Sequence, residues 1–137
     1  MNSQNVNELI DILGRETGIY EELLKISKDK TELIVKGKVD ELDEITKLEQ
    51  NYIADIGKLE YLREKTVKAL TETLGVNHSD ITISELIKHL NKDNAKELEE
   101  CKKNLIDIIE EIKTVNELNS KLIQNSIDYI NFSINIL

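Results

Sequence analysis

The chain contains no proline in 137 residues, and large apolar residues recur at spacings of three and four along almost all of it. Proline breaks a helix interior, and the three-and-four spacing places apolar side chains on one face of a helix. The composition agrees, because 39% hydrophobic and 33% charged residues, rich in Leu, Ile, Glu and Lys, are typical of long amphipathic helices. We therefore predict an all-α protein.

Two long helices are predicted in the first half of the chain. The first covers residues 1–37 and ends at Gly37, a residue that suits a left-handed helix cap. The second covers residues 40–75, with Asp40 as its N-cap and Gly75 at its end. Because the linker between them is so short, these helices must fold back on each other as an antiparallel hairpin.

The clearest local signal in the second half is the start of a short helix. Thr82 and Glu85 have the spacing of a capping box, in which each side chain accepts a hydrogen bond from the other residue's backbone amide. Ile81 and Leu86 have the spacing of a hydrophobic staple across the same helix start. We predict a short helix at 82–91.

A third long helix follows the short one. Asn94 is expected to cap it, its body covers 94–122, and an apolar tail continues at 123–137. The predicted architecture is a single domain over residues 1–137, an antiparallel bundle of three long helices plus one short helix, with an apolar C-terminal helical segment.

Charge and cysteine usage limit the partners and the compartment. A formal net charge of −9 without a basic stripe argues against nucleic acid as a partner. Cys101 is the only cysteine, which excludes an intrachain disulfide and fits a reducing compartment. The start of the chain lacks the features of a secretory signal, and no apolar run approaches the ~18 residues of a membrane span. We predict a cytoplasmic protein that does not insert into a membrane.

Residues able to carry catalysis or bind metal are sparse. His78 and His89 do not have the spacing of a helical metal motif, and Cys101 lies in an apolar stripe where a small buried side chain is the usual outcome. No glycine-rich phosphate-binding loop is present. The sequence therefore predicts neither enzyme activity nor a metal or other cofactor.

The C-terminal tail differs from the rest of the chain in charge. Residues 119–137 carry only Lys121 and Asp128, whereas the preceding part of the same helix is rich in Lys, Asp and Glu. On a helix, the apolar tail residues divide into one stripe of Ile123, Ile127, Ile130, Ile134 and Leu137 and a second set, Leu122, Tyr129, Phe132 and Ile136, beside or across from it. One contact with the bundle cannot bury both sets.

We predict that the tail binds a partner protein. Large exposed apolar surfaces normally mark such sites, and the residues expected to carry binding are Ile123, Ile127, Tyr129, Ile130, Phe132, Ile134 and Leu137. Two alternatives are a homodimer formed through the tail and complete burial of the tail by the other helices. Interleaved Asn and Ser residues lower the helix propensity, so the tail is expected to be loosely ordered alone and helical when docked.

Three segments together resemble the FlgN family of flagellar export chaperones. They are "LIDILGRETGIYEELLKISKDKTELIVKG" at 9–37, "LEQNYIADIGKLEYLREK" at 48–65 and "NELNSKL" at 116–122. The residues that carry the likeness include Glu16, Tyr20, Lys30, Glu49, Leu59, Glu60, Arg63, Asn116 and Asn119. The family's C-terminal segment is variable, so the tail is not matched residue by residue.

The resemblance implies a function that composition and periodicity alone do not give. It implies a cytoplasmic chaperone without ATPase activity that binds hook-filament junction proteins, prevents their premature assembly and delivers them to the flagellar type III export apparatus. In that family a C-terminal amphipathic helix binds the substrate protein. A helical coiled-coil adaptor or scaffold without chaperone activity is the alternative function, and a secretion chaperone with another client is a further one.

Overall fold

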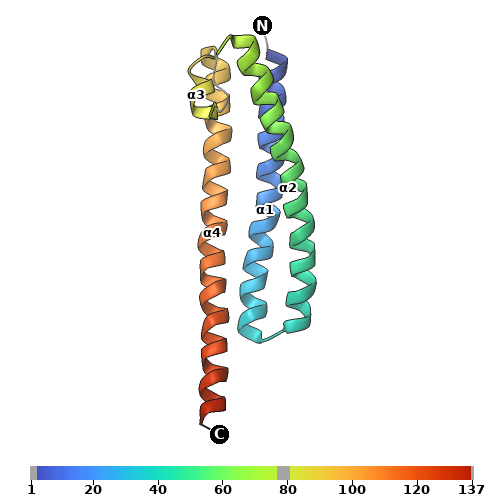
Figure 1. Cartoon of the computed structure of the whole chain (residues 1–137), viewed down its shortest axis with the longest axis vertical. Helices are drawn as coiled ribbons and strands as arrows, with labels where there is room; N and C mark the ends of the chain where they lie inside the picture. Colours follow the sequence, from blue (N-terminus) through green and yellow to red (C-terminus); the bar gives the residue numbers. More distant parts are fainter. Residues whose placement is uncertain (1–2, 77–80, 137) are drawn as a thin grey trace.

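The computed structural model describes residues 3–76 and 81–136 and is built from four α-helices (Figure 1). They are α1 (Ser3–Lys36), α2 (Val39–Leu74), α3 (Ile83–Ile87) and α4 (Lys92–Asn135). Within the described residues no strand is present. The prediction of an all-α protein with three long helices and one short one is confirmed.

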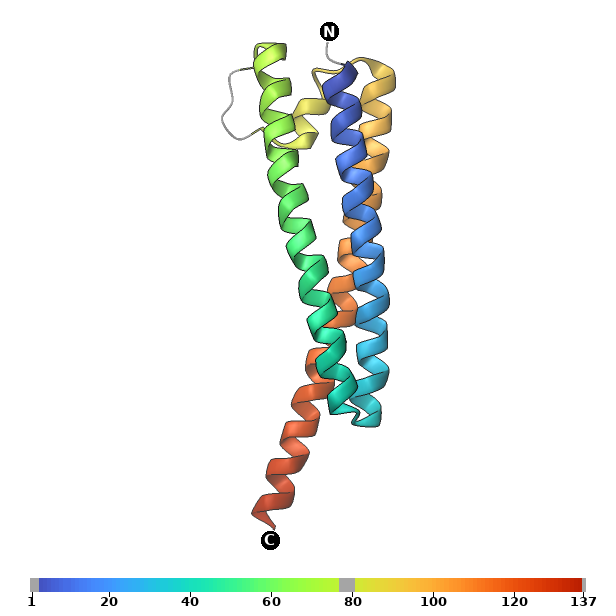
Figure 2. The same cartoon turned by 90° about the vertical axis from the view of Figure 1, so that its right-hand side faces the viewer.

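Helix α1 is the central element of the bundle. It packs against both α2 and α4, whereas the short α3 packs on α4 near the N-terminal end of the bundle. Helices α1 and α2 form an antiparallel hairpin, and α4 runs beside α1 in the same direction (Figures 1 and 2). The last turns of α4 extend past the hairpin and stand apart from the other helices.

The two glycines that were expected to end helices do so. Gly37 and Gly75 have φ values of 69° and 68°, a left-handed conformation that costs little only for glycine. The prediction that Asp40 caps α2 is wrong, because the helix begins one residue earlier, at Val39. Lys38 takes the N-cap position without a side-chain hydrogen bond, and Asp40 lies in the first turn, where its charge still favours the helix dipole.

The capping box at the start of α3 is present in part. Thr82 Oγ1 accepts a hydrogen bond from the Glu85 backbone N–H at 3.2 Å, and Leu86 is fully buried. The helix is shorter than the predicted 82–91, because residues 88–90 instead form tight turns with bonds to carbonyls three residues back.

Helix α4 also begins earlier than predicted. Asn91, rather than Asn94, is the N-cap, and its Oδ1 accepts a hydrogen bond from the Asn94 backbone N–H at 2.9 Å. Asn91 has the extended backbone conformation that a cap requires, so it takes the position first. Two asparagines three residues apart can each act as a cap, and the sequence did not distinguish them.

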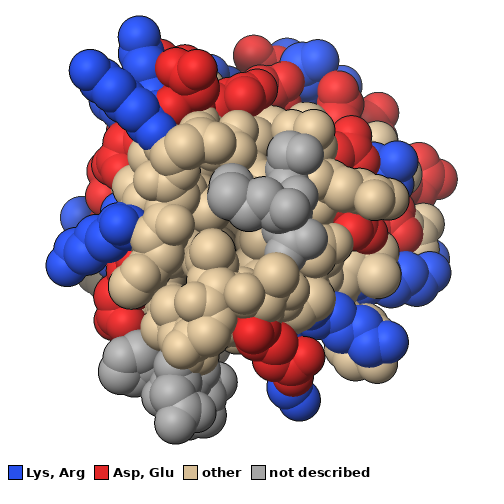
Figure 3. All heavy atoms as spheres, turned by 90° about the horizontal axis from the view of Figure 1, so that it is seen from above, with Lys and Arg blue, Asp and Glu red and all other residues tan. Residues whose placement is uncertain are grey.

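The main core lies where all four helices meet. Every helix contributes at least one leucine to this core, and α1 also contributes a valine. Its buried residues are Val6, Leu9, Leu13, Leu70, Leu86, Leu98 and Leu105. Figure 3, which looks onto this end of the bundle, shows uncharged residues gathered over the centre and charged side chains around the rim. The burial of leucines on four helices fixes this end, which is the end opposite the tail.

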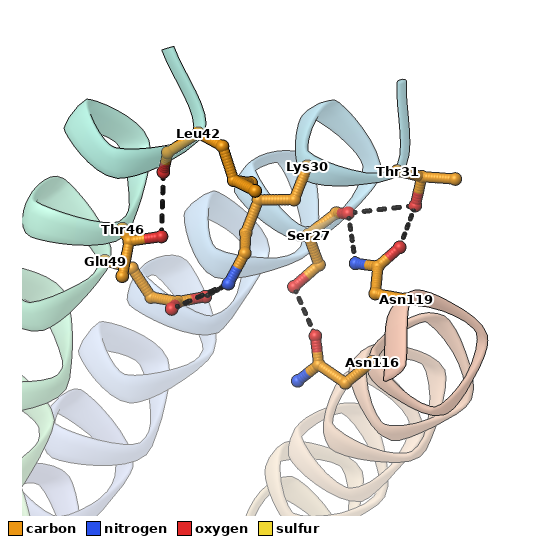
Figure 4. A network of polar contacts seen from close by, with 8 residues as sticks. All are labelled: Ser27, Lys30, Thr31, Leu42, Thr46, Glu49, Asn116 and Asn119. Carbon is orange, nitrogen blue, oxygen red and sulfur yellow. Dashed lines mark hydrogen bonds and ion pairs between the residues drawn. The ribbon is translucent and has the colours of Figure 1, made fainter. Parts of the chain in front are cut away.

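Two ion pairs join α1 to α2 away from this core. Arg63 Nη1 lies 2.7 Å from Glu16 Oε2, and Lys30 Nζ lies 3.1 Å from Glu49 Oε1 (the second pair is drawn in Figure 4). All four residues were among those that carry the family resemblance. The structure shows that they form pairs.

The pair of Glu16 and Arg63 is the more deeply buried one. The Glu16 side chain is 1% exposed, and its Oε1 atom receives no hydrogen bond. Burial raises the pKa of Glu16, Arg63 opposes that shift, and the nearby Glu60 adds to it. Arg63 is therefore the group that makes an ionised Glu16 tolerable inside the bundle.

We predict that Arg63→Met destabilises the protein in a pH-dependent way. At pH 7 the unfolding free energy should fall on the order of 3 kcal/mol, because a buried carboxylate loses its partner. A carboxyl whose pKa is higher in the folded protein than in the unfolded chain destabilises the fold as the pH rises through that pKa. The loss should therefore be smaller at pH 5 than at pH 7 in urea unfolding followed by circular dichroism.

The control for this prediction is the double variant Glu16→Leu/Arg63→Met. Because it removes the buried charge together with its partner, it should recover most of the lost stability and abolish the difference between pH 5 and pH 7. An equal loss at both pH values in the single variant would contradict the role given to Glu16.

Candidate functional site

The C-terminal part of α4 displays a continuous set of exposed apolar side chains. The helix continues without a break to Asn135. Ile123 and Ile127 are 42% and 44% exposed, and Tyr129, Ile130, Phe132 and Ile134 range from 56% to 71%. A cluster of about half-exposed large apolar side chains at the end of one helix is uncommon in a monomeric protein, and such a cluster indicates a contact surface.

The exposed isoleucines lie beside the face of α4 that packs on α1. That packing face runs through Leu98, Leu105 and Asn119, which are all buried. Ile123, Ile127, Ile130 and Ile134 follow a neighbouring line along the helix, which we call the isoleucine stripe. The stripe therefore remains accessible while α4 stays attached to α1.

A layer of polar side chains marks the last firm attachment of α4 to α1 (Figure 4). Asn119 Nδ2 donates to the Ser27 carbonyl at 2.9 Å, and Thr31 Oγ1 donates to Asn119 Oδ1. Ser27 Oγ also donates to Asn116 Oδ1 at 3.0 Å. Asn119 is buried, and a buried amide with specific partners fixes the register of packed helices, because a shift of one helix would leave it unsatisfied.

A shallow hollow lies where the tail leaves α1. It is lined by Ile34 and Val35 at the end of α1 and, from α4, by Leu122, Asn125, Ser126, Tyr129 and Ile130. Val35 is 69% exposed. The hollow thus extends the apolar surface of the tail onto the end of the hairpin. The sequence analysis did not assign Ile34 and Val35 to the site, because their place beside the tail depends on the register of α1 against α4.

The groups considered for metal binding or as a reactive thiol lie apart from one another in residues 3–76 and 81–136. No group of three or more His, Cys, Asp or Glu side chains there could hold a metal ion. Burial raises the pKa of the Cys101 thiol, and Glu97 and Glu100 raise it further, so the thiol is not activated as a thiolate. His89 is exposed on the solvent side, and His78 lies outside the described residues.

None of the helices in the described part of the chain combines the length and apolar character needed to cross a membrane. The apolar tail is short, and polar Asn and Ser residues interrupt it.

The structure places the predicted site residues as follows. Six of them lie exposed on one helical segment, Ile123, Ile127, Tyr129, Ile130, Phe132 and Ile134, and the seventh, Leu137, lies outside the described residues. Complete burial of the tail by the other helices is excluded for the described residues.

The expectation of a loosely ordered tail differs from the structure. The helix continues from the long, well-packed part of α4 through the Asn and Ser residues of the tail.

The fold and its exposed surface define the structural class, a slender all-α bundle whose longest helix ends in exposed isoleucines. Comparison with known proteins then gives the family: the chain matches the family model described as FlgN protein over residues 1–137, and it belongs to this family. The resemblance seen in the sequence is confirmed.

A curated relative matches most of the chain. The chain is 34% identical over 129 residues to the Bacillus subtilis (strain 168) protein named "Uncharacterized protein YvyG". The aligned region covers 94% of this chain and 78% of the relative. No solved structure matches the chain.

We predict that Asn119→Ala weakens the attachment of α4 to α1. The unfolding free energy should fall by about 1–3 kcal/mol, because buried partners on α1 lose their hydrogen bonds. Asn104→Ala is the matched control, since Asn104 is exposed on the same helix and gains the same helix propensity. Equal effects in chemical unfolding of the two variants would contradict the role of the polar layer.

We also predict that removing residues 123–137 leaves a folded bundle. No described side chain in that segment is buried, so the unfolding free energy should change by no more than about 1 kcal/mol. Circular dichroism should show a cooperative thermal transition with a smaller helical signal. A truncated chain that no longer unfolds cooperatively would show that the tail is part of the core.

Proposed function

We propose that this protein is a cytosolic flagellar type III export chaperone that acts by binding and not by catalysis. Its clients are hook-filament junction proteins, and it prevents their premature assembly before passing them to the export apparatus. Membership of the FlgN family supports the chaperone class. The single observation that carries the binding site is the exposed apolar surface at the end of α4.

The proposed contact residues are the isoleucine stripe together with Tyr129, Phe132 and Leu137. Full burial of one large apolar side chain contributes ~1.5–3 kcal/mol. Since the six described side chains are about half exposed, their burial against a client could contribute on the order of 5–9 kcal/mol. That amount can offset part of the entropic cost of association, and the hollow at Val35 adds to it.

The chemistry of the tail indicates what kind of segment it binds. Residues 119–137 carry one positive and one negative side chain, so the tail offers no strong charge for a charged ligand. An amphipathic client helix can lay its apolar face along such a surface, with anchors at three-and-four spacing. Covering that client face keeps it from associating with other copies of the client.

The polar layer at Asn119 supports this arrangement from behind. It holds the start of the tail on α1 through Ser27 and Thr31, so that the isoleucine stripe leaves the bundle in a defined direction. A client helix then meets a preformed helix and not a flexible segment. The ordering cost of binding is lower for a preformed surface.

We predict that Ile127→Glu/Ile130→Glu abolishes client binding without unfolding the protein. Two lost apolar contacts and two buried charges should lower the affinity at least about 100-fold. Isothermal titration calorimetry with a purified hook-filament junction protein of the same organism measures this, and circular dichroism checks the fold. Ile106→Glu is the matched control, because Ile106 is 42% exposed on the body of the same helix.

The outcome distinguishes the chaperone from an adaptor that binds elsewhere. Loss of binding in the tail variant with less than about a threefold change in the control supports the proposed site. If both variants bind the client as well as the unchanged protein does, the tail is not the site. If the unchanged protein does not bind a junction protein at all, the client assignment is wrong.

A further inference from the structure

We propose that the isoleucine stripe also binds a second copy of this chain, with the two tails side by side and antiparallel. In this pair Ile123 packs on Ile134 of the second copy, and Ile127 packs on Ile130 of the second copy. Each contact occurs twice because of the twofold symmetry. The pairing uses the surface that the proposed function assigns to the client, so the second copy covers the site in the absence of a client.

The spacing of the stripe favours this arrangement. Ile123, Ile127, Ile130 and Ile134 are separated by four, three and four residues, a pattern that reads the same in both directions. Two such helices turned antiparallel therefore match every isoleucine with an isoleucine. The three-and-four alternation is also the spacing by which knobs of one helix enter holes of another.

The residues that flank the stripe are compatible with the same register. In an antiparallel pair, a residue that directly follows a core position faces a residue that directly follows a core position on the other helix. Gln124 follows Ile123 and Asn131 follows Ile130, so Gln124 faces Asn131 of the second copy. On the other edge Ser126 faces Ser133 of the second copy. All of these side chains are neutral and polar, so no like charges meet at either edge.

The distribution of charge separates the antiparallel pair from a parallel one. Lys121 and Asp128 cancel within the tail, and the whole formal net charge of −9 therefore lies on residues 1–118. A parallel pair would bring two strongly negative bodies side by side. An antiparallel pair places the bodies at opposite ends, where distance and salt screen their repulsion.

The shape of the molecule permits this arrangement. The end of α4 extends past the α1–α2 hairpin, so a second tail can approach it from the side (Figures 1 and 2). The stripe lies beside, and not on, the face that packs on α1, which leaves the attachment at Asn119 intact on both copies.

The pair is expected to be weak and reversible. Each copy contributes four isoleucines to the contact, whereas a standard stable interface contains about 20–30 residues per side. A client that also reaches the hollow at Val35 covers more surface and displaces the second copy. Self-pairing thus protects the apolar stripe and still leaves it available to the client.

Disulfide trapping tests the register directly. In a Cys101→Ser background, Ile123→Cys is mixed with a larger, tagged Ile134→Cys chain and exposed to a mild oxidant. In the antiparallel pair these two positions meet, whereas the two copies of position 123 are about 16 Å apart along the helix axis, eleven residues at 1.5 Å each. The mixed dimer should exceed either homodimer at least about tenfold.

A mixture of Ile106→Cys with Ile134→Cys gives the baseline for random collisions, because Ile106 is exposed outside the stripe. A mixed dimer no more abundant than this baseline overturns the proposal. A homodimer of Ile123→Cys that forms as readily as the mixed dimer overturns it as well, since it shows a parallel pair.

The cysteine substitutions could themselves weaken the pair, so the unaltered chain is also measured by analytical ultracentrifugation. The molar mass should rise from 15.7 kDa towards twice that value as the concentration increases, and Ile127→Glu should abolish the rise. A mass that stays monomeric up to millimolar concentration overturns the proposal.

These measurements use the protein without a client, so they are separate from the test of the proposed function. A dimer without client binding would refute the chaperone site alone, and client binding by a strict monomer would refute the self-pairing alone. If both hold, added junction protein should reduce the mixed disulfide in proportion to its binding.

Discussion

Helix α4 is longer than the helix on which it packs, and this difference in length determines the form of the molecule. It has 44 residues against 34 in α1, and it runs beside α1 in the same direction. Once the register is set at the shared end, the last turns of α4 have no helix to lie against. The isoleucine stripe is exposed for this reason, and the function proposed for it follows from a surface that the fold does not cover.

Two kinds of interaction hold the register that produces this projection. Leucines from four helices form the core at one end, and polar pairs act farther along α1. The Glu16–Arg63 pair and the Asn119 layer stabilise little in net terms, because desolvation offsets their attraction. Their main effect is to make other alignments of the helices unfavourable, since a shifted helix would leave a buried carboxylate or amide without a partner.

The sequence predicted the features that depend on local chemistry. Gly37 and Gly75 end helices because their conformation suits only glycine, and Thr82 caps α3 through a bond three residues away. The exposed tail followed from the fall in charge. The choice of Asn91 over Asn94 was missed because neighbouring residues compete for one cap. The pairing of Glu16 with Arg63 was missed because the two residues are 47 positions apart in the sequence and meet only through the register of α1 against α2.

The central claim is that the apolar end of α4 is uncovered in the free monomer and becomes covered by a client. Amide hydrogen exchange measured by mass spectrometry, at a concentration where the protein is monomeric, tests it most directly. Amides beyond Asn119 should exchange much faster than those of the α1-packed part of α4, and a junction protein should slow them selectively. Tail amides that are already as protected as the core in the free monomer, or that a bound client leaves unchanged, would contradict it.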